Sequence, residues 1–432
     1  MQRYSFILYL QTTHCKTFYF YHFLYPHLFY PYVYAGVSFC YHLTMPCRLM
    51  AFLVVIRMFF VEKIVIFAHY SVVKMTIHIF NPEHDIALAV GRARFTAPRA
   101  GRWLRRDLDF LPSFWAKRGD VVLVESPADA HRKLRALALD TDARLLDKRA
   151  LSALMRAHSG QPVHVSPWGW DAAIRQELLD CGVPADSLPS ADQIARVRTM
   201  SHRAWAAQHL LPTLTRQMGT VGQARLATCL EEVSAMCRTH RDLMLKAPWS
   251  SSGRGVRRMR CHDGHDDFAV ASPLLNWAKH VIERQGGVMV EPWYDKVVDF
   301  GMEFAHRDGV GVMFEGLSVF QTVNGAYMGN VVDTEEAKGD FLAQYVSSSL
   351  LARVRQTVCA VMEPLLDGTC CERFGVDMMV VRTESGLRLH PCVELNLRTT
   401  MGHVALALAQ LRKPLPAVMR VAYERSYHLE LS

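Results

Sequence analysis

From Met75 onward, short β-rich runs alternate with amphipathic helical segments, and this alternation restricts the fold more than any other feature. The runs at 76–80 (TIHIF) and 120–126 (DVVLVES) are typical of buried strands, and 128–139 (ADAHRKLRALAL) has the periodicity of a helix. Strands separated by helices favour a parallel sheet with helices on its faces. We therefore predict the α/β class, with a Rossmann-like parallel-sheet domain over residues 75–195.

The rest of the chain is predicted to hold longer strands and helices, and 432 residues suffice for two or three domains. Helices are predicted at 171–181, 190–211, 224–240 and 341–367, and strands at 242–247, 287–293, 297–305 and 310–323. A hairpin is predicted at 374–398, and the last forty or so residues are predicted to be mostly helical.

Residues 1–74 differ in composition from everything that follows them. They carry +5 of the chain's net +8 and are crowded with Tyr, Phe and His without a periodic pattern. The apolar run 49–73 has the length of a membrane span, but Arg57, Glu62 and Lys63 interrupt it. We favour an extension from a misassigned start, with Met75 as the natural first residue, over a membrane anchor.

Charge and cysteine usage bound the partners and the compartment. Outside residues 1–74 the net charge is only +3, which gives no reason to expect a nucleic-acid partner. Eleven cysteines occur without a CxxC pair, so a reducing, cytoplasmic location is expected rather than a disulfide framework.

The stretch LKAPWSSSGRGV at 245–256 is the first candidate for a functional loop. Lys246 ends an apolar run and is followed by Ser250, Ser251, Ser252 and Gly253. Backbone N–H groups of such a loop can point at an anion, and a lysine at the strand end adds a fixed charge. Neither the Walker nor the GxGxxG pattern is present, and the stretch alone reads equally well as a plain turn.

The hairpin at 374–398 is the stronger candidate. A two-residue turn at Ser385-Gly386 would place Asp377 directly opposite Glu394. Paired carboxylates repel each other unless a cation lies between them, and with Asn396 on the same face they offer oxygen ligands suited to Mg²⁺. The alternative is an amphipathic surface strand with an incidental acid pair.

The segment at 288–300 (VMVEPWYDKVVDF) lies between these two motifs. Glu291 ends a strand and could accept the amino group of a purine, with Trp293 and Tyr294 stacking on the ring and Asp299 accepting ribose hydroxyls. The alternative is that the two aromatic residues pack a joint between domains.

In order and rough spacing, these motifs resemble the carboxylate–amine ligases of the ATP-grasp superfamily. KAPWSSSGRGV resembles their lysine and flexible loop, and VELNLR resembles their E-x-N metal strand. The pattern from Met75, with NPEHDIALA, also resembles an uncharacterised ATP-grasp group from Bacteroidetes. The resemblance implies a two-lobed ATP-grasp fold after the N-terminal domain, with a small lobe at 196–290 and a large lobe at 291–432.

The resemblance also implies roles for individual residues. Lys246, Ser250, Ser251, Ser252 and Gly253 would hold the phosphates of ATP, Glu291, Trp293 and Tyr294 the adenine, Asp299 the ribose, and Asp377, Glu394 and Asn396 two Mg²⁺ ions. His202 or Arg203 would replace a second phosphate-facing lysine of the family. An arginine common two positions before the first metal aspartate is Gly375 here, and Arg398 would take over its contact with the reacting oxyanion.

The implied activity is an ATP- and Mg²⁺-dependent ligase that activates a carboxylate as an acyl phosphate for attack by an amine or thiol. Lys246 and Arg398 would be its catalytic residues, and a homodimer is one candidate assembly. The rival is an ATP-binding module without turnover, with a sensing or scaffolding role. Glu83, His84 and Asp85 are either substrate contacts or a helix cap with a surface histidine, and His403 is either a base or a helix-start residue.

Overall fold

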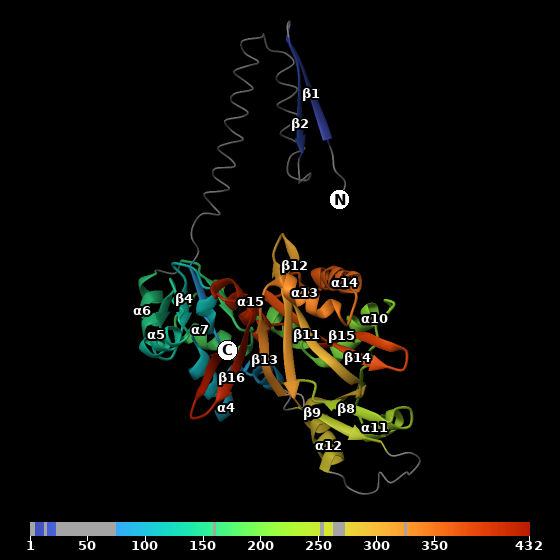
Figure 1. Cartoon of the computed structure of the whole chain (residues 1–432). Coiled ribbons are helices and arrows are strands. Elements are labelled where there is room, and N and C mark those ends of the chain that lie inside the picture. Colours follow the sequence, from blue (N-terminus) through green and yellow to red (C-terminus); the bar gives the residue numbers. More distant parts are fainter. Residues whose placement is uncertain are drawn as a thin grey trace. The chain divides into compact units, whose positions relative to one another are not determined.

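The computed structural model describes residues 5–12, 15–22, 75–158, 161–250, 255–261, 273–323 and 326–432 (Figure 1). The chain divides into two compact units, Met1–Val73 and Lys74–Ser432. In the first unit, β1 (Ser5–Thr12) pairs with β2 (Cys15–His22) as an antiparallel hairpin. Within the described part of the chain, no helix has the length and apolar character needed to cross a membrane.

The second unit begins with the predicted parallel sheet. Its strand order is β5-β4-β3-β6, with β3 (Thr76–Ile79), β4 (Val121–Leu123), β5 (Arg144–Leu146) and β6 (His164–Pro167). Three helices each start just after a strand, at α5 (Pro127–Ala136), α6 (Lys148–Ala157) and α7 (Ala172–Asp180). Ser126, Asp147 and Asp171 cap them by accepting backbone N–H groups, which fixes where each helix begins.

Shorter helical elements complete this region. They are α3 (His84–Val90), α4 (Arg99–Leu108) and the 3₁₀ turn η1 (Leu111–Phe114). The N-terminal region is thus the predicted α/β arrangement, with β3 and β4 buried on both faces.

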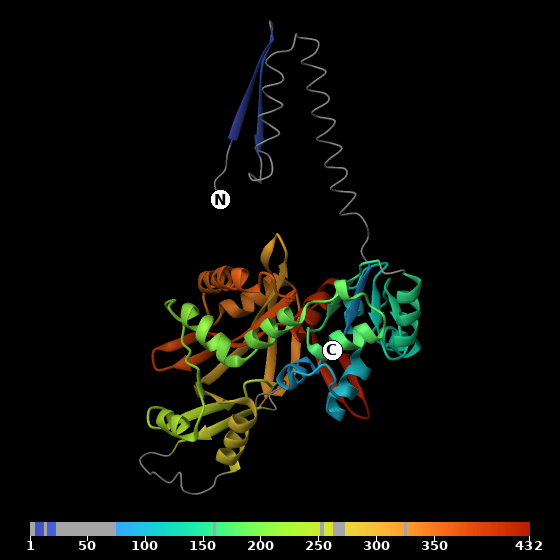
Figure 2. The same cartoon turned by 180° about the vertical axis from the view of Figure 1, so that it is seen from behind.

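The predicted single helix at 190–211 is wrong, because the structure breaks it into three. The pieces are α8 (Ala191–Met200), α9 (Arg203–His209) and α10 (Leu211–Leu214), coloured green where they cross the large sheet in Figure 2. The imidazole of His202 accepts the backbone N–H of Ala204 and so starts a new helix there. The break puts Arg203 at the start of α9.

The small lobe is an antiparallel sheet in the order β7-β10-β8-β9. Its strands are β7 (Arg225–Ala227), β8 (Asp242–Lys246), β9 (Val256–Arg260) and β10 (Val288–Pro292), packed with α11 (Leu230–Cys237) and α12 (Pro273–Gln285). The helix predicted at 224–240 is therefore partly wrong, since its first residues form β7. Strand pairing of Leu226 with Met289 of β10 outweighs the local helical pattern there.

The large lobe is a seven-stranded antiparallel sheet in the order β15-β14-β11-β12-β13-β16-β17. Its strands are β11 (Asp295–Arg307), β12 (Gly311–Val323), β13 (Ala326–Val332), β14 (Arg373–Thr383), β15 (Gly386–Asn396), β16 (Ala417–Tyr423) and β17 (Tyr427–Leu431). Its helices are α13 (Glu335–Ala343), α14 (Ser348–Leu366) and α15 (Met401–Leu411). A parallel-sheet domain followed by two lobes on antiparallel sheets confirms the predicted fold class.

Two predictions for the large lobe are wrong. The helix predicted at 341–367 is interrupted, because the Ser347 side chain accepts the N–H of Leu350 and caps α14. The last residues are not mostly helical, because α15 is followed by the β16–β17 hairpin. Pro414 and Pro416 have no N–H for a helix, and Met419 and Leu429 alternate into the core.

Candidate active site

Arg203 joins the end of β8 to the metal-strand candidate. One of its Nη atoms donates to the Ala247 carbonyl at 2.6 Å and to Ser250 Oγ at 2.8 Å, and the other lies 2.6 Å from Glu394 Oε1. Burial alone would lower the pKa of Arg203, but the Glu394 carboxylate raises it above its ordinary value. The start of α9, the loop after β8 and the strand β15 therefore meet at one guanidinium.

The hairpin β14–β15 brings Asp377 opposite Glu394, as predicted, although the turn lies elsewhere. Thr383 pairs with Gly386, so Glu384 and Ser385 form the turn, and the register near the turn differs from the predicted one. Between the pairs Met379–His390 and Asp377–Glu394 the register shifts, because a bulge adds two residues to β15. Pro391 lies in this bulge, and β15 is an edge strand of the sheet. The bulge restores the pairing of the two carboxylates.

The acid pair is strongly perturbed electrostatically. Burial, and next the facing Glu394 carboxylate, raise the pKa of Asp377 to about 7. Asn396 donates from Nδ2 to Asp377 Oδ2 at 3.1 Å, and its Oδ1 accepts from Arg398 at 3.0 Å. Asp377, Glu394 and Asn396 therefore share one face of the hairpin, where Arg203 already pairs with Glu394.

Arg398 is partly buried and is held by Asp85 of the N-terminal domain. Its Nη2 lies 3.0 Å from Asp85 Oδ2, and its Nε is 3.2 Å from both Asp85 oxygens. Burial would raise the pKa of Asp85, but the Arg398 guanidinium lowers it. Asp85 is thus the N-terminal domain's contact with the metal strand.

Glu83 and His84, the other two candidates after β3, are held by residues of the N-terminal domain. His84 is buried, with its Nδ1 3.4 Å from Asp171 Oδ2, so the expectation of a surface histidine is wrong. Glu83 forms an ion pair with Arg105 at 2.9 Å. The polar residues after β3 therefore serve three different contacts.

Lys246 and Glu291, predicted to bind phosphates and adenine separately, contact each other. They lie on adjacent antiparallel strands, where Met289 is the residue opposite Lys246. Lys246 Nζ is 2.6 Å from Glu291 Oε2, and both side chains are buried. An ion pair removed from water is favourable only when its geometry is good or further partners are present. A ligand that separates Lys246 from Glu291 would meet a buried cation and a buried carboxylate.

Tyr294 and Trp293 follow β10 into different surroundings. Tyr294 packs edge-on against His390 with ring centroids 5.3 Å apart, and burial and the Glu291 charge raise its pKa to about 12. Trp293 is more exposed and has the Arg258 guanidinium 3.9 Å from its ring centroid. Of the two aromatic candidates, only Tyr294 lies in the buried environment beside Glu291.

The other residues predicted to bind the nucleotide are His202, Asp299 and the loop after Ser250. His202 caps α9 and packs against Trp249, and burial followed by the charges of Arg198 and Arg203 lowers its pKa. Asp299 forms an ion pair with Lys296 and a hydrogen bond with Thr322. Ser251, Ser252 and Gly253 lie outside the described residues.

Glu303 is a residue of this face that sequence reasoning missed. It is fully buried on β11, and Thr400 Oγ1 donates to its Oε2 at 2.8 Å. A Cβ on Gly375 would lie 2.5 Å from the same oxygen, and a Cβ on Gly402 would lie 1.9 Å from Oε1. The carboxylate thus occupies the space beside position 375, where the resemblance implies an arginine.

His403 lies in the same network as Glu303 and is a helix-start residue, one of the two alternatives left open. Its Nδ1 accepts the N–H of Thr400, completing a capping box, and lies 3.1 Å from Glu303 Oε2. Burial lowers the pKa of His403 to about 3, while burial and then Asp377 raise the pKa of Glu303 to about 8. A protonated Glu303 facing a neutral His403 satisfies both groups.

His390 is a second residue that the sequence did not single out. It is almost fully buried on β15, and neither ring nitrogen has a hydrogen-bond partner in the described part of the chain. Burial and the nearby Lys246 charge lower its pKa to about 3. A neutral imidazole with free polar atoms therefore adjoins Tyr294 and Lys246.

The oxygen donors of the hairpin suit magnesium only when phosphates complete its coordination. Among the described residues, no group of three or more His, Cys, Asp or Glu side chains is arranged to hold a metal ion alone. Mg²⁺ bound together with phosphates, however, needs only one or two carboxylates from the protein. Asp377 and Glu394, which face each other across the hairpin, fit that mode.

No protein-family model matches the sequence, and no curated protein matches it. Solved structures do match. N5-carboxyaminoimidazole synthetase from Staphylococcus aureus, complexed with ADP, is 14% identical over 81% of this chain and 82% of its own, with a TM-score of 0.41. Biotin carboxylase from Campylobacter jejuni, in a β-γ-ATP complex, is 10% identical over 81% of this chain and 75% of its own, with a TM-score of 0.47.

A third match is the biotin carboxylase domain of a Hydrogenobacter thermophilus 2-oxoglutarate carboxylase, in complex with MgADP, ADP and bicarbonate. It is 10% identical over 81% of this chain and 74% of its own, with a TM-score of 0.46. The residue roles proposed for the present chain rest on its own contacts.

Proposed function

We propose that this chain is an ATP-grasp ligase that uses Mg²⁺ and ATP to activate a substrate carboxylate for attack by an amine or thiol. The observation that carries the proposal is the convergence at Arg203, which bonds to Ser250 of the predicted phosphate loop and to Glu394 of the predicted metal strand. Paired acids, a buried lysine and a serine loop at one place are the parts that a Mg-nucleotide site requires.

Residues of both lobes would hold the nucleotide. ATP would supply the γ-phosphoryl group that turns a carboxylate into an acyl phosphate, and Mg²⁺ would offset the charge of the phosphates. Lys246 and Arg203 would face phosphate oxygens, and Tyr294 would contact the base. Asp377 and Glu394 would hold the metal, with Asn396 orienting Asp377 through its amide.

Catalysis would come mainly from positioning and charge. Arg398 is held in place by Asp85 and Asn396, so its guanidinium is oriented before any substrate arrives. A preorganised cation beside the acid pair would stabilise negative charge on the reacting carboxylate. We propose Arg398 and Lys246 as the catalytic residues; no side-chain nucleophile is needed for this chemistry.

The first test is calorimetric titration with Mg²⁺ and a non-hydrolysable ATP analogue. The wild type should bind the analogue only with the metal present, and Glu394→Gln should weaken binding by about tenfold or more because one of two metal carboxylates is lost. Glu372→Gln is the matched control, since this acid lies outside the site and is paired with His164. Metal-independent or absent binding would contradict the proposal.

The second test separates a ligase from an ATP-binding module. ADP release is measured across carboxylates combined with amines or thiols, in the wild type and in Glu394→Gln. A ligase releases ADP only with a productive pair, and the release is lost in the variant. Tight Mg-nucleotide binding without release for any pair would favour the sensing or scaffolding role.

A further inference from the structure

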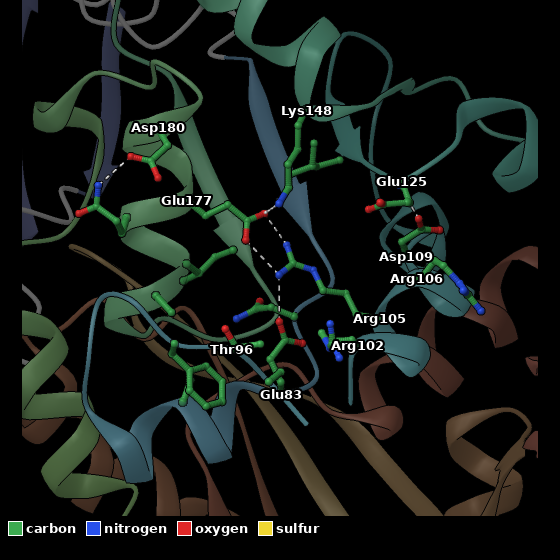
Figure 3. Close-up of a pocket in the computed structure, with 18 of the residues that line it drawn as sticks. Glu83, Thr96, Arg102, Arg105, Arg106, Asp109, Glu125, Lys148, Glu177 and Asp180 are labelled. Carbon is green, nitrogen blue, oxygen red and sulfur yellow. Dashed lines mark hydrogen bonds and ion pairs between the residues drawn. The ribbon is translucent and has the colours of Figure 1, made fainter. Parts of the chain in front are cut away.

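A large polar cavity opens at the carboxyl edge of the parallel sheet and is lined by residues of the N-terminal domain between positions 81 and 181 (Figure 3). Its volume is about 1080 Å³, and its lining includes Asn81 after β3, Val124 after β4, Lys148 after β5 and Asp171 after β6. Ligands of α/β sheets bind at this edge, because the loops that follow parallel strands meet there. The cavity is large enough for a small-molecule substrate.

The floor of the cavity is a fixed ion-pair network. Arg105 donates to Glu83 at 2.9 Å and to the two oxygens of Glu177 at 3.1 and 2.7 Å, while Lys148 lies 3.1 Å from Glu177 (Figure 3). These contacts raise the pKa of Arg105 against the effect of burial. The network thus pairs two of the acids that line the cavity, Glu83 and Glu177, with cations.

Several other cations of the lining have no such partner, although Arg106 pairs with Asp107. Within the described ranges, Arg94, Arg102 and Arg149 line the cavity and have no hydrogen bond or ion pair through their side chains, and Arg99 is held only by its stacking on Trp103 at 4.1 Å. Four further acids line the cavity. Asp109 accepts the backbone N–H of Glu125, and Glu125 itself is exposed. Asp171 caps α7, and Asp180 accepts a hydrogen bond from Gln176. Unpaired guanidinium groups around a cavity favour an anionic ligand.

One acceptor in the cavity is also unsatisfied. Glu83 Oε2 is buried and has no hydrogen-bond partner among the described residues, although Oε1 of the same carboxylate is bonded to Arg105. A buried polar atom without a partner is costly, so the position favours a ligand that brings a donor. A molecule with an anionic group and a hydroxyl or amine would satisfy both features.

The cavity is connected to the proposed active site through one turn of helix. Glu83 is the N-cap residue of α3, and Asp85 in its first turn holds Arg398. Binding at Glu83 therefore acts on the element that positions the catalytic guanidinium.

We propose that this cavity binds one substrate of the ligase. The substrate is a small molecule whose phosphate or carboxylate group is held by Arg94, Arg99 and Arg102. Its hydroxyl or amine group donates a hydrogen bond to Glu83. The assignment of this ligand as a substrate rests on the proposed function. The binding site itself stands on the cavity's own residues.

Binding is tested on the full chain without nucleotide, by calorimetry with glycerol 3-phosphate, citrate and, as a neutral control, glycerol. At least one anionic probe should bind and glycerol should not; the phosphate and carboxylate probes tell which anion is preferred. The double variant Arg94→Gln/Arg102→Gln should weaken binding by about tenfold or more. Arg118→Gln, an exposed cation outside the cavity, should bind as the wild type does.

Mg-nucleotide binding is measured on the same variants to keep the two proposals separate. Unchanged nucleotide binding in the double variant shows that it is folded, so a loss of probe binding is then due to the cavity. Glu83→Gln should weaken binding of glycerol 3-phosphate less than the double variant does, since it keeps an acceptor. No binding of either anionic probe to the wild type, or equal binding to the double variant, would overturn the proposed site; loss of nucleotide binding in Glu394→Gln alone bears only on the ligase.

Discussion

At the scale of single residues, the unusual feature is the buried carboxyl group of Glu303, which lies near a second acid, Asp377. Glu303 is buried beside Thr400 and His403, and its raised pKa is caused by burial first and by Asp377 second. Its position explains why residue 375 is a glycine, because any side chain there would meet the carboxylate. The Glu303 carboxylate is thus the physical reason why position 375 holds a glycine and not the arginine that the resemblance implies.

Glu303 should make stability depend on pH. Its pKa in the folded chain is about 8, against an ordinary value of 4.5, so the native state binds more protons across this window and stability falls as pH rises through it. Glu303→Gln removes this cost, and its melting temperature should move from near the wild-type value at pH 5 to clearly above it at pH 8.5. Thermal unfolding at both pH values measures the difference.

The matched control for that experiment is Glu384→Gln, which changes an exposed acid in the turn between β14 and β15. It should shift the melting temperature little between the two pH values. A wild-type minus Glu303→Gln difference that stays constant from pH 5 to pH 8.5 would show that Glu303 is ionised throughout.

Gly402 should tolerate no side chain. A Cβ there would lie 1.9 Å from Glu303 Oε1 and 2.5 Å from Ser318 Oγ, both buried, so Gly402→Ala should reduce the free energy of unfolding by about 1–3 kcal/mol. Gly339→Ala, in the open space around α13, should be neutral or stabilise by up to about 1 kcal/mol. Denaturant unfolding distinguishes the two, and equal effects would contradict the close packing at Glu303.

At the scale of secondary-structure elements, Arg203 depends on the break between α8 and α9. Arg203→Met would leave Glu394 and Ser250 without their shared donor, which should cost about 1–3 kcal/mol of unfolding free energy and weaken Mg-nucleotide binding by about tenfold. Arg196→Met on α8 is the control, since that residue donates only to backbone carbonyls. Thermal unfolding and calorimetry measure both effects; equal behaviour of the two variants would argue against the role of Arg203.

The elements also show where sequence reasoning succeeds and fails. The strands β8, β10 and β11 could be predicted because each is a short apolar run, and β10 and the second half of β11 are buried almost continuously. The pairing of Asp377 with Glu394 was predicted, but from a turn one residue away from the real one, since a bulge near Pro391 cannot be placed from local sequence. The strand β7 was missed because its pairing with the distant strand β10 decides it, and β16 and β17 were missed because the prolines before them end the helix and the two strands pair as a hairpin.

Contacts between distant segments explain the rest of what the sequence could not show. Nothing local at Glu303 or His390 distinguishes them from ordinary strand residues; their interest comes from neighbours such as Thr400 and Lys246. The Lys246–Glu291 and Arg398–Asp85 pairs likewise join residues far apart in the chain. The resemblance pointed to individual residues of this region, but their pairings could be seen only in the fold.

At the scale of the whole molecule, Lys74–Ser432 is a compact unit with its own core. A chain starting at Met75 should therefore unfold at the same temperature as the full chain, within about 2 °C, since about 1 kcal/mol shifts the midpoint of a domain this large by only about 2–4 °C. Differential scanning calorimetry measures this midpoint. Aggregation or a clearly lower midpoint of the shorter chain would show that residues before Met75 stabilise the fold.

The most direct test of the central claim is crystallographic: Mn²⁺ in place of Mg²⁺, with a non-hydrolysable ATP analogue, located by anomalous scattering. The account predicts a metal peak between the Asp377 and Glu394 carboxylates, with the phosphates towards Lys246 and Ser250. A peak at any other place, or a nucleotide bound away from this acid pair, would contradict it.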